Sequence, residues 1–178
     1  MNIWHEIDKE RIKPDDFIAF IEIPKGSRKK YELDKDTGLV ILDRILYTST
    51  VYPANYGLIP LTYGGDNDPL DVLVLCSEPL DPGTLVRCKP IGMITMVDGG
   101  EMDEKIIAVA VKDPTVKDFN EITELPHHVY EQIQNFFAIY KTLEHKETQV
   151  DDEVKDSNVA KKTIADAIEN YQNKLNKS

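Results

Sequence analysis

The residues with the clearest chemical potential form a short acidic stretch in the first half of the chain. Residues 66–71 read DNDPLD and follow the glycine pair Gly64 and Gly65. Carboxylates this close repel one another unless a cation lies among them. Hard cations such as Mg²⁺ prefer such oxygen ligands. Taken alone, the stretch fits an acidic surface turn equally well. An EF-hand calcium loop is excluded, because Asp71 and Ser77 stand where it requires Gly and Glu.

A second acidic segment follows a long apolar run. Residues 98–105 read DGGEMDEK, so glycines again join two expected strands and carboxylates again gather at the turn. By itself this segment fits an ordinary hairpin loop. Two acidic loops at strand ends can meet at one rim of a barrel, where they would hold several metal ions.

Charged residues near the N-terminus add a second kind of chemistry. Glu22 interrupts the apolar run 17–23, where a charge is costly without a partner, and Lys25, Lys30 or Arg44 can supply one. A strand-end glutamate that reaches solvent is the alternative. Lys30 and Glu32 alternate onto one strand face, and Arg44 follows the return strand. Lys30 and Arg44 are therefore candidates to clamp a phosphate group.

Four further residues have weaker signals. Tyr52 and Tyr56 lie in VYPANYG and can donate phenolic hydrogen bonds to phosphate, or simply pack on the fold. Tyr140 falls on the apolar stripe of an expected helix, so periodicity favours a core position. On the same basis, the neighbouring Lys141 is an exposed side chain.

The elements that must position these residues are short strands followed by two helices. Strands are expected at 17–23, 31–33, 39–42, 72–76, 85–97 and 105–111, with a hairpin turn at 34–38. Helices are expected over about 126–144 and 157–175, the second capped by Ser157, with a solvated linker at 151–156. The prediction is an α+β fold: a small antiparallel β-barrel, core about 17–112, with two external helices, forming one domain over 1–178.

The composition limits the classes of molecule that the protein is expected to bind. The 178 residues are 41% hydrophobic and 30% charged, with a formal charge of −11. This field disfavours nucleic acid and anionic membranes as partners, although an anion can still bind through cations. The polar N-terminal start and the lack of a long apolar run predict a cytoplasmic protein. Cys76 and Cys88 are expected to be reduced.

Several common chemistries have no support. The sequence contains no Gly-x-Gly-x-x-Gly, Walker loop, Gly-x-Ser-x-Gly or His-Glu-x-x-His motif. The four histidines lack metal-ligand spacing and are interpreted as surface residues. These are His5, His127, His128 and His145.

Taken together, the motifs resemble the soluble inorganic pyrophosphatases of the barrel type, called family I. The stretch 66–72, DNDPLDV, matches the family signature. Further matches, in order, are IEIP at 21–24, KYE at 30–32, DR at 43–44, YPxxYG at 52–57, DxxxxDxK at 98–105 and YK at 140–141. The resemblance spans residues 3–141. After Lys141, this chain departs from the Gly-Trp-containing run of many members.

The resemblance implies a role for each matched residue. Asp66, Asp71 and Asp103 would ligate the metals nearest the attacking water, while Asp98, with Asp103, would hold those that accompany the substrate. Glu22 would assist through bound water, and Asp68 would orient the attacking water or accept its proton. Glu32 would tune the surrounding shell. The phosphate-holding residues would be Lys30, Arg44, Lys105, Tyr140 and Lys141, supported by Tyr56 and Tyr52. Tyr56 would also be catalytic, together with Asp68.

The implied function is magnesium-dependent hydrolysis of inorganic pyrophosphate to two orthophosphates by a metal-activated water. The resemblance also implies an OB-like barrel, several Mg²⁺ ions per active site, no organic cofactor and a homohexamer. Two alternatives stay open: a metal-dependent nucleotide or phosphoester hydrolase, and a non-enzymatic OB-like module that binds phosphate or metal.

Overall fold

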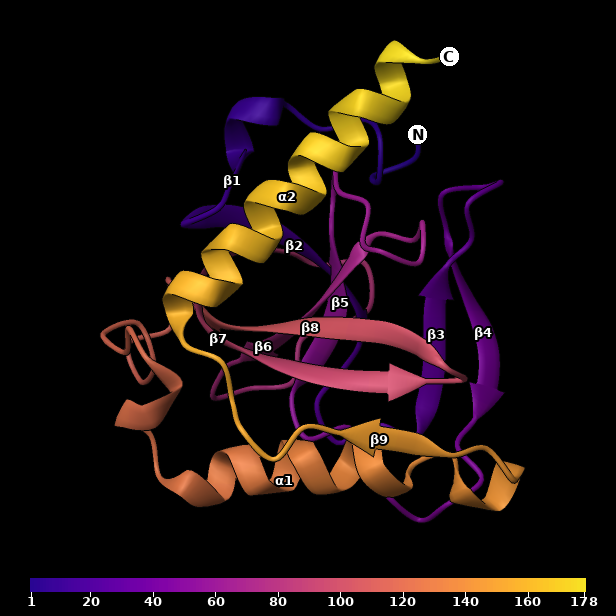
Figure 1. The fold of residues 1–178 in the computed structure, drawn as a ribbon, viewed down its shortest axis with the longest axis vertical. Coiled ribbons are helices and arrows are strands. Elements are labelled where there is room, and N and C mark those ends of the chain that lie inside the picture. The colour runs from indigo at the N-terminus through magenta and orange to yellow at the C-terminus, as the bar shows by residue number, and fades with distance from the viewer.

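The computed structural model describes all residues from Met1 to Ser178 and shows a β-sheet flanked by two α-helices (Figure 1). The strands are β1 (Ile12–Lys13), β2 (Asp16–Ile23), β3 (Lys29–Leu33), β4 (Val40–Ile45), β5 (Asn55–Ile59), β6 (Leu70–Leu75), β7 (Leu85–Asp98), β8 (Glu101–Ala110) and β9 (Thr148–Val150). The helices are α1 (His127–Ile139) and α2 (Ser157–Asn176), with short 3₁₀ helices η1 (Lys9–Arg11), η2 (Ile122–Glu124) and η3 (Thr142–Glu144).

The main sheet closes on itself. Its strand order is β1-β2-β5-β6-β8-β7-β9, and an additional pairing of β2 with β7 joins the two sides into a ring. The ring contains β2, β5, β6, β8 and β7. This arrangement matches the expected small barrel, and closure leaves few exposed strand edges.

One ring pairing corrects the prediction of a wholly antiparallel barrel. β6 and β8 run parallel, with Asp71 opposite Lys105. The cause is the tight hairpin between β7 and β8, where Gly99 and Gly100 both have positive φ angles of 60° and 82°. The hairpin places β8 between β6 and β7, which fixes its direction relative to β6.

The second sheet is a separate two-stranded hairpin. β3 and β4 pair antiparallel with Lys30 opposite Arg44, and the turn between them ends at Gly38, whose φ is 76°. This confirms the hairpin predicted from the 34–38 segment. Figure 1 shows β3 and β4 standing beside the ring at the right of the view.

The helices cover different parts of the barrel. The apolar stripe of α1, including Ile133, Phe136 and Phe137, packs into one core cluster with Leu73 and Ile107. The stripe of α2 packs into a second cluster through Ala160, Ile164 and Ala167. No helix of the structure is long and apolar enough to cross a membrane.

Several local expectations were wrong. β5 was not foreseen as a strand, since its five residues include Gly57. β9 pairs with the end of β7 in a region without a strand prediction. α1 ends at Ile139, earlier than the expected residue 144, and the chain continues into η3. Asp156 caps α2 by accepting from Val159 N, so Ser157 is not the cap.

Candidate active site

A cavity of about 240 Å³ lies where the barrel ring meets the β3–β4 hairpin. Seven acidic side chains and four lysines line it, together with three tyrosines. The predicted site residues among its lining are Glu22, Lys30, Glu32, Tyr56, Asp66, Asp68, Asp71, Asp98, Asp103, Lys105, Tyr140 and Lys141. The fold therefore brings residues from 22 to 141 together around one polar hollow.

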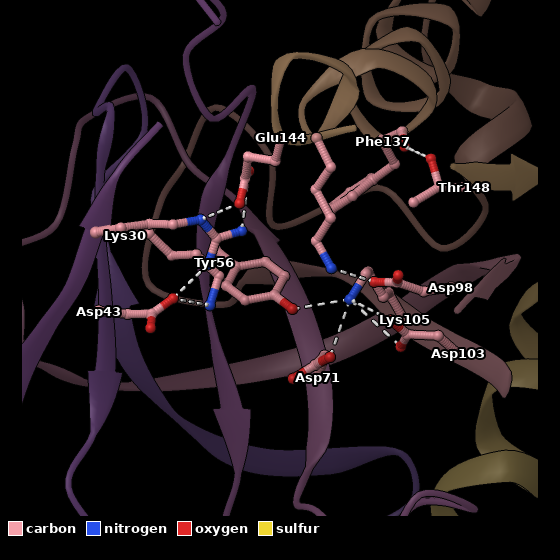
Figure 2. Close-up of polar contacts among 12 residues, drawn as sticks. Lys30, Asp43, Tyr56, Asp71, Asp98, Asp103, Lys105, Phe137, Glu144 and Thr148 are labelled. Atoms are coloured by element: carbon pink, nitrogen blue, oxygen red, sulfur yellow. Dashed lines mark hydrogen bonds and ion pairs between the residues drawn. The ribbon is translucent and has the colours of Figure 1, made fainter. Parts of the chain in front are cut away.

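The centre of this site is the ammonium group of Lys105 (Figure 2). Lys105 is 2% exposed, and its Nζ lies 2.9 Å from Asp71 Oδ2, 3.2 Å from Asp103 Oδ2 and 2.8 Å from Tyr56 Oη. Burial alone would lower the pKa of Lys105, but the neighbouring Asp71, Tyr56 and Asp103 outweigh it and raise the pKa well above its usual value. The side chain therefore stays charged between the carboxylates.

Strand alternation explains why these groups meet. Asp103 and Lys105 are two residues apart on β8 and so share a face. Asp71 is opposite Lys105 on β6, and Leu58, two residues beyond Tyr56, is opposite Asp71 on β5. The face that carries the site is thus built from three neighbouring strands.

Glu22 enters the cavity from a β-bulge. The register between β2 and β5 shifts between Ile21 and Ile23, which leaves Glu22 as the extra residue. Its side chain accepts a hydrogen bond from Leu33 N at 2.7 Å. The expected partners Lys25, Lys30 and Arg44 make no ion pair with it. Burial, with a smaller contribution from Asp71, raises the pKa of Glu22 to about 8.

The acidic loop before β6 lines another part of the cavity and contacts the hairpin turn. Burial and the nearby Asp71 raise the pKa of Asp66, and burial with Asp71 also raises the pKa of Asp103. Asp68 forms an ion pair with Lys35 from the hairpin turn. Lys35 was not predicted as a site residue, because the turn signal around it indicated only a reversal of the chain.

The end of α1 supplies the third side of the cavity. Lys141 Nζ lies 2.5 Å from Asp98 Oδ2, so Lys141 is not the merely exposed side chain that periodicity favoured. Tyr140 packs in the core against Phe136 and Phe137 and also lines the cavity. Burial raises the pKa of Tyr140, so its hydroxyl stays protonated and can donate.

The hairpin contributes a cation pair. Lys30 Nζ lies 3.2 Å from Asp43 Oδ2, and Arg44 Nη1 contacts the same oxygen. Figure 2 shows Lys30 and Asp43 on neighbouring hairpin strands, with Glu144 facing them from beyond α1. The two cations predicted to clamp an anion thus converge on one carboxylate oxygen.

Two predicted residues lie outside the cavity lining. Tyr52 is 1% exposed and packs between Tyr56 and Phe136, with ring centroids 5.3 Å and 4.6 Å away. The direct substrate contact predicted for Tyr52 is therefore not supported; its position is behind Tyr56. Arg44 lies at the border, held by Asp43 and by Glu144. Glu144 had no sequence signal, because its partner is 100 residues away.

The donor set fits hard divalent cations. The acidic side chains outnumber the lysines, they supply only oxygen ligands, and the raised pKa values of Asp66 and Asp103 reflect burial and crowding that a cation would relieve. In the structure no three acidic side chains converge on one point closely enough to surround an ion. Lys105 lies between Asp71 and Asp103 instead. Metal ligation by these residues stays a prediction.

Comparison with known proteins decides the family. A model of the family described as inorganic pyrophosphatase matches residues 19–172. The chain belongs to this family. It is 50% identical over 169 residues to soluble inorganic pyrophosphatase 2 of Chlamydomonas reinhardtii, covering 95% of this chain and 88% of that protein. It is 44% identical to the inorganic pyrophosphatase of Picrophilus torridus, covering 97% of each chain.

Solved structures of the inorganic pyrophosphatase family share the fold. The crystal structure of inorganic pyrophosphatase from Thermus thermophilus superimposes with a TM-score of 0.90 at 36% identity, covering 97% of this chain and 99% of that one. The inorganic pyrophosphatase structure from Helicobacter pylori superimposes with a TM-score of 0.87 at 40% identity, covering 90% of this chain and 96% of that one. The predicted resemblance and fold class are thereby confirmed. The family match reaches residue 172, so it includes most of α2 although the motifs ended at Lys141.

Proposed function

We propose that this protein hydrolyses inorganic pyrophosphate to two orthophosphates with Mg²⁺, through attack of a metal-activated water. Family membership confirms the predicted enzyme class, an inorganic diphosphatase. The observation that carries the mechanism is the cavity itself, in which buried Lys105 is surrounded by Asp71, Asp103 and Tyr56. Such a site suits a highly anionic substrate that arrives with cations.

The carboxylates divide the work of holding metal. Asp66, Asp71 and Asp103 would ligate the ions nearest the attacking water, and Asp98 with Asp103 those that accompany the substrate, with Glu22 assisting through water. When bound, magnesium ions screen the charge of the substrate and lower the pKa of the attacking water. Several Mg²⁺ ions per active site and no organic cofactor are proposed on this basis.

The cationic and phenolic groups would hold the phosphates. Lys105 and Lys141 are held in place by Asp71 and Asp98 respectively, so both ammonium groups are pre-oriented toward the cavity. Arg44 and Lys30 would approach from the hairpin. Tyr56 and Tyr140, both kept protonated by burial, would donate hydrogen bonds to phosphate oxygens. Tyr52 would support Tyr56, and Glu32 would tune this shell.

The reaction itself needs one proton acceptor and several charge-stabilising donors. The water oxygen forms a bond to one phosphorus as the bond from that phosphorus to the bridging oxygen breaks. Asp68, at the rim of the cavity, would orient the water and accept its proton. Arg44 and the lysines would stabilise the negative charge that develops on the leaving phosphate.

The proposal extends to the whole protein. We propose one catalytic domain over residues 1–178, a cytoplasmic location and assembly as a homohexamer, with neither nucleic acid nor membrane as a partner. The charge of −11 supports the last point, because it repels polyanions. Sedimentation or light scattering at several protein concentrations measures the assembly directly.

A substrate panel tests the assigned activity. Phosphate release is measured at saturating Mg²⁺ from pyrophosphate, tripolyphosphate, ATP, ADP and p-nitrophenyl phosphate. We expect kcat/KM for pyrophosphate to exceed that for every other compound by at least about 100-fold, because no sequence feature assigns a base or ribose pocket. A higher value for a nucleotide supports the phosphoester-hydrolase alternative. Tight binding of imidodiphosphate without turnover of pyrophosphate supports the binding-module alternative.

A further inference from the structure

Arg44 is held by a partner from the opposite end of the site. Glu144 lies in η3, directly after the helix end that carries Tyr140 and Lys141. Its Oε2 accepts a hydrogen bond from Arg44 Nη2 at 3.2 Å, and its Oε1 lies 2.8 Å from Arg44 Nε. The second contact is an ion pair without hydrogen-bond alignment, since Nε has no well-directed acceptor. The Glu144 side chain is only 8% exposed.

The contact with Glu144 determines which N–H groups of the Arg44 guanidinium are directed toward Lys30. A guanidinium has five N–H donors in a planar fork. Glu144 takes the side formed by Nε and Nη2, which leaves Nη1 and the second hydrogen of Nη2. Nη1 points to the Asp43 oxygen that Lys30 also contacts. The Nη1 edge of Arg44 therefore lies beside Lys30, and both cations contact Asp43 in the structure, an arrangement that also suits a shared anion.

The same contact joins two separately built parts of the protein. β3 and β4 form a sheet of their own, linked to the ring by contacts such as Leu33 N to Glu22. Tyr140 and Lys141 follow directly after α1. Glu144 connects these parts across 100 residues of sequence, and Figure 2 shows it between the hairpin and α1.

We infer that Glu144 is a positioning residue for pyrophosphate binding: it orients the Arg44 guanidinium and keeps the hairpin cations in register with Tyr140 and Lys141. The inference rests on the proposed phosphate-binding role of Arg44. Its physical basis is preorganisation, because an arginine held in one rotamer loses less entropy when it binds an anion.

Three single variants measure how much Glu144 contributes to pyrophosphate binding. Glu144→Ala removes the tether, Glu144→Gln keeps one oxygen acceptor for Nη2, and Glu147→Ala removes an exposed acidic side chain three residues away as the matched control. We expect KM for pyrophosphate and the Kd of imidodiphosphate, both with Mg²⁺, to rise about tenfold in Glu144→Ala and about threefold in Glu144→Gln. We expect kcat to change less than KM, and Glu147→Ala to match wild type.

Two results would contradict a positioning role for Glu144. Glu144 also offsets the charge of Arg44, so removing it would lower KM if neutralisation were its main effect. A lower or unchanged KM in Glu144→Ala, with wild-type thermal stability, overturns the inference. Equal effects in Glu144→Ala and Glu147→Ala overturn it as well, because they indicate only a general change in charge.

A double variant separates this inference from the proposed function. In an Arg44→Gln background, we expect Glu144→Ala to change KM by less than about twofold, since the group it orients is gone. A full tenfold effect in that background contradicts positioning through Arg44. If Arg44→Gln alone leaves KM and Kd unchanged, that result contradicts the proposed phosphate-binding role of Arg44. The Arg44→Gln variant is therefore measured before the Glu144 variants.

Discussion

Asp71 and Lys105 are direct neighbours in the parallel pair of β6 and β8, and the Lys105 ammonium lies 2.9 Å from the Asp71 carboxylate. This parallel register places a buried cation among the acidic residues of the cavity. The ammonium is also 5.1 Å from the ring centroids of Tyr56 and Phe137. Charge, hydrogen bonds and aromatic rings together fix the position of the group that we propose contacts substrate.

Replacing Lys105 tests this arrangement. In Lys105→Met we expect kcat/KM for pyrophosphate to fall by at least about 100-fold, because a preorganised donor is lost. Without metal, the free energy of unfolding should fall by about 3 kcal/mol, because Asp71 and Asp103 lose their buried partner. Mg²⁺ should restore part of this stability by supplying positive charge.

The control for this experiment is Lys162→Met, which alters a lysine that is 77% exposed. We expect its free energy of unfolding to stay within about 0.5 kcal/mol of wild type. Equal losses in Lys105→Met with chelator and with Mg²⁺, measured by urea unfolding, would contradict the metal-binding role of the carboxylates.

Gly57 is a second sensitive position, for steric reasons. It lies in β5 between Ile21 of β2 and Val72 of β6, and a Cβ there would lie 1.9 Å from the Phe20 carbonyl oxygen. Backbone must move to accommodate it, so Gly57→Ala should lower the free energy of unfolding by at least about 2 kcal/mol. Gly65→Ala is the matched control, because a Cβ there meets nothing within 4 Å. Similar losses in both variants would refute the steric explanation.

Asp113 provides a pH-dependent test outside the cavity. Hydrogen bonds from the backbone N–H groups of Ser77 and Thr115 hold the pKa of Asp113 well below its usual value. Since the folded pKa is depressed, the stability that it contributes is present above the unfolded pKa of about 3.9 and is lost as the pH falls below it.

We therefore expect Asp113→Asn to lower the melting temperature at pH 7, with a difference from wild type that shrinks progressively below about pH 4. Asn offers one oxygen acceptor where Asp offers two, so one N–H loses its partner. Asp118→Asn serves as the control, because it makes the same substitution at an exposed aspartate. A difference from wild type that is constant from pH 7 to pH 3 would show that the charge of Asp113 contributes nothing.

The sequence was most informative where function and local structure coincide. The 66–71 stretch, the 98–105 hairpin and the cations Lys30 and Arg44 were all identified from residue type and spacing, and all but Arg44 reach the cavity lining. The roles of Asp103 in metal binding and Lys105 in phosphate binding came only from the family resemblance. Assigning Tyr140 and Lys141 required the family resemblance, because periodicity favoured a core tyrosine and an exposed lysine.

The remaining features depend on contacts that have no local signal. The parallel register of β6 and β8 follows from the insertion of β8 beside β7. Lys35 reaches Asp68 from 33 residues away, and Glu144 reaches Arg44 from 100. The bulge at Glu22 depends on the register of β2 against β5, which spacing within one strand does not reveal.

The most direct test of the central proposal is phosphate release from pyrophosphate by wild type and Asp71→Asn, each with Mg²⁺ and with excess chelator. We predict rapid release by wild type only with Mg²⁺, and a loss of at least about 100-fold in the variant, with circular dichroism showing that both are folded. Release that survives excess chelator, or wild-type activity in Asp71→Asn, would contradict the proposed metal-dependent mechanism at this cavity.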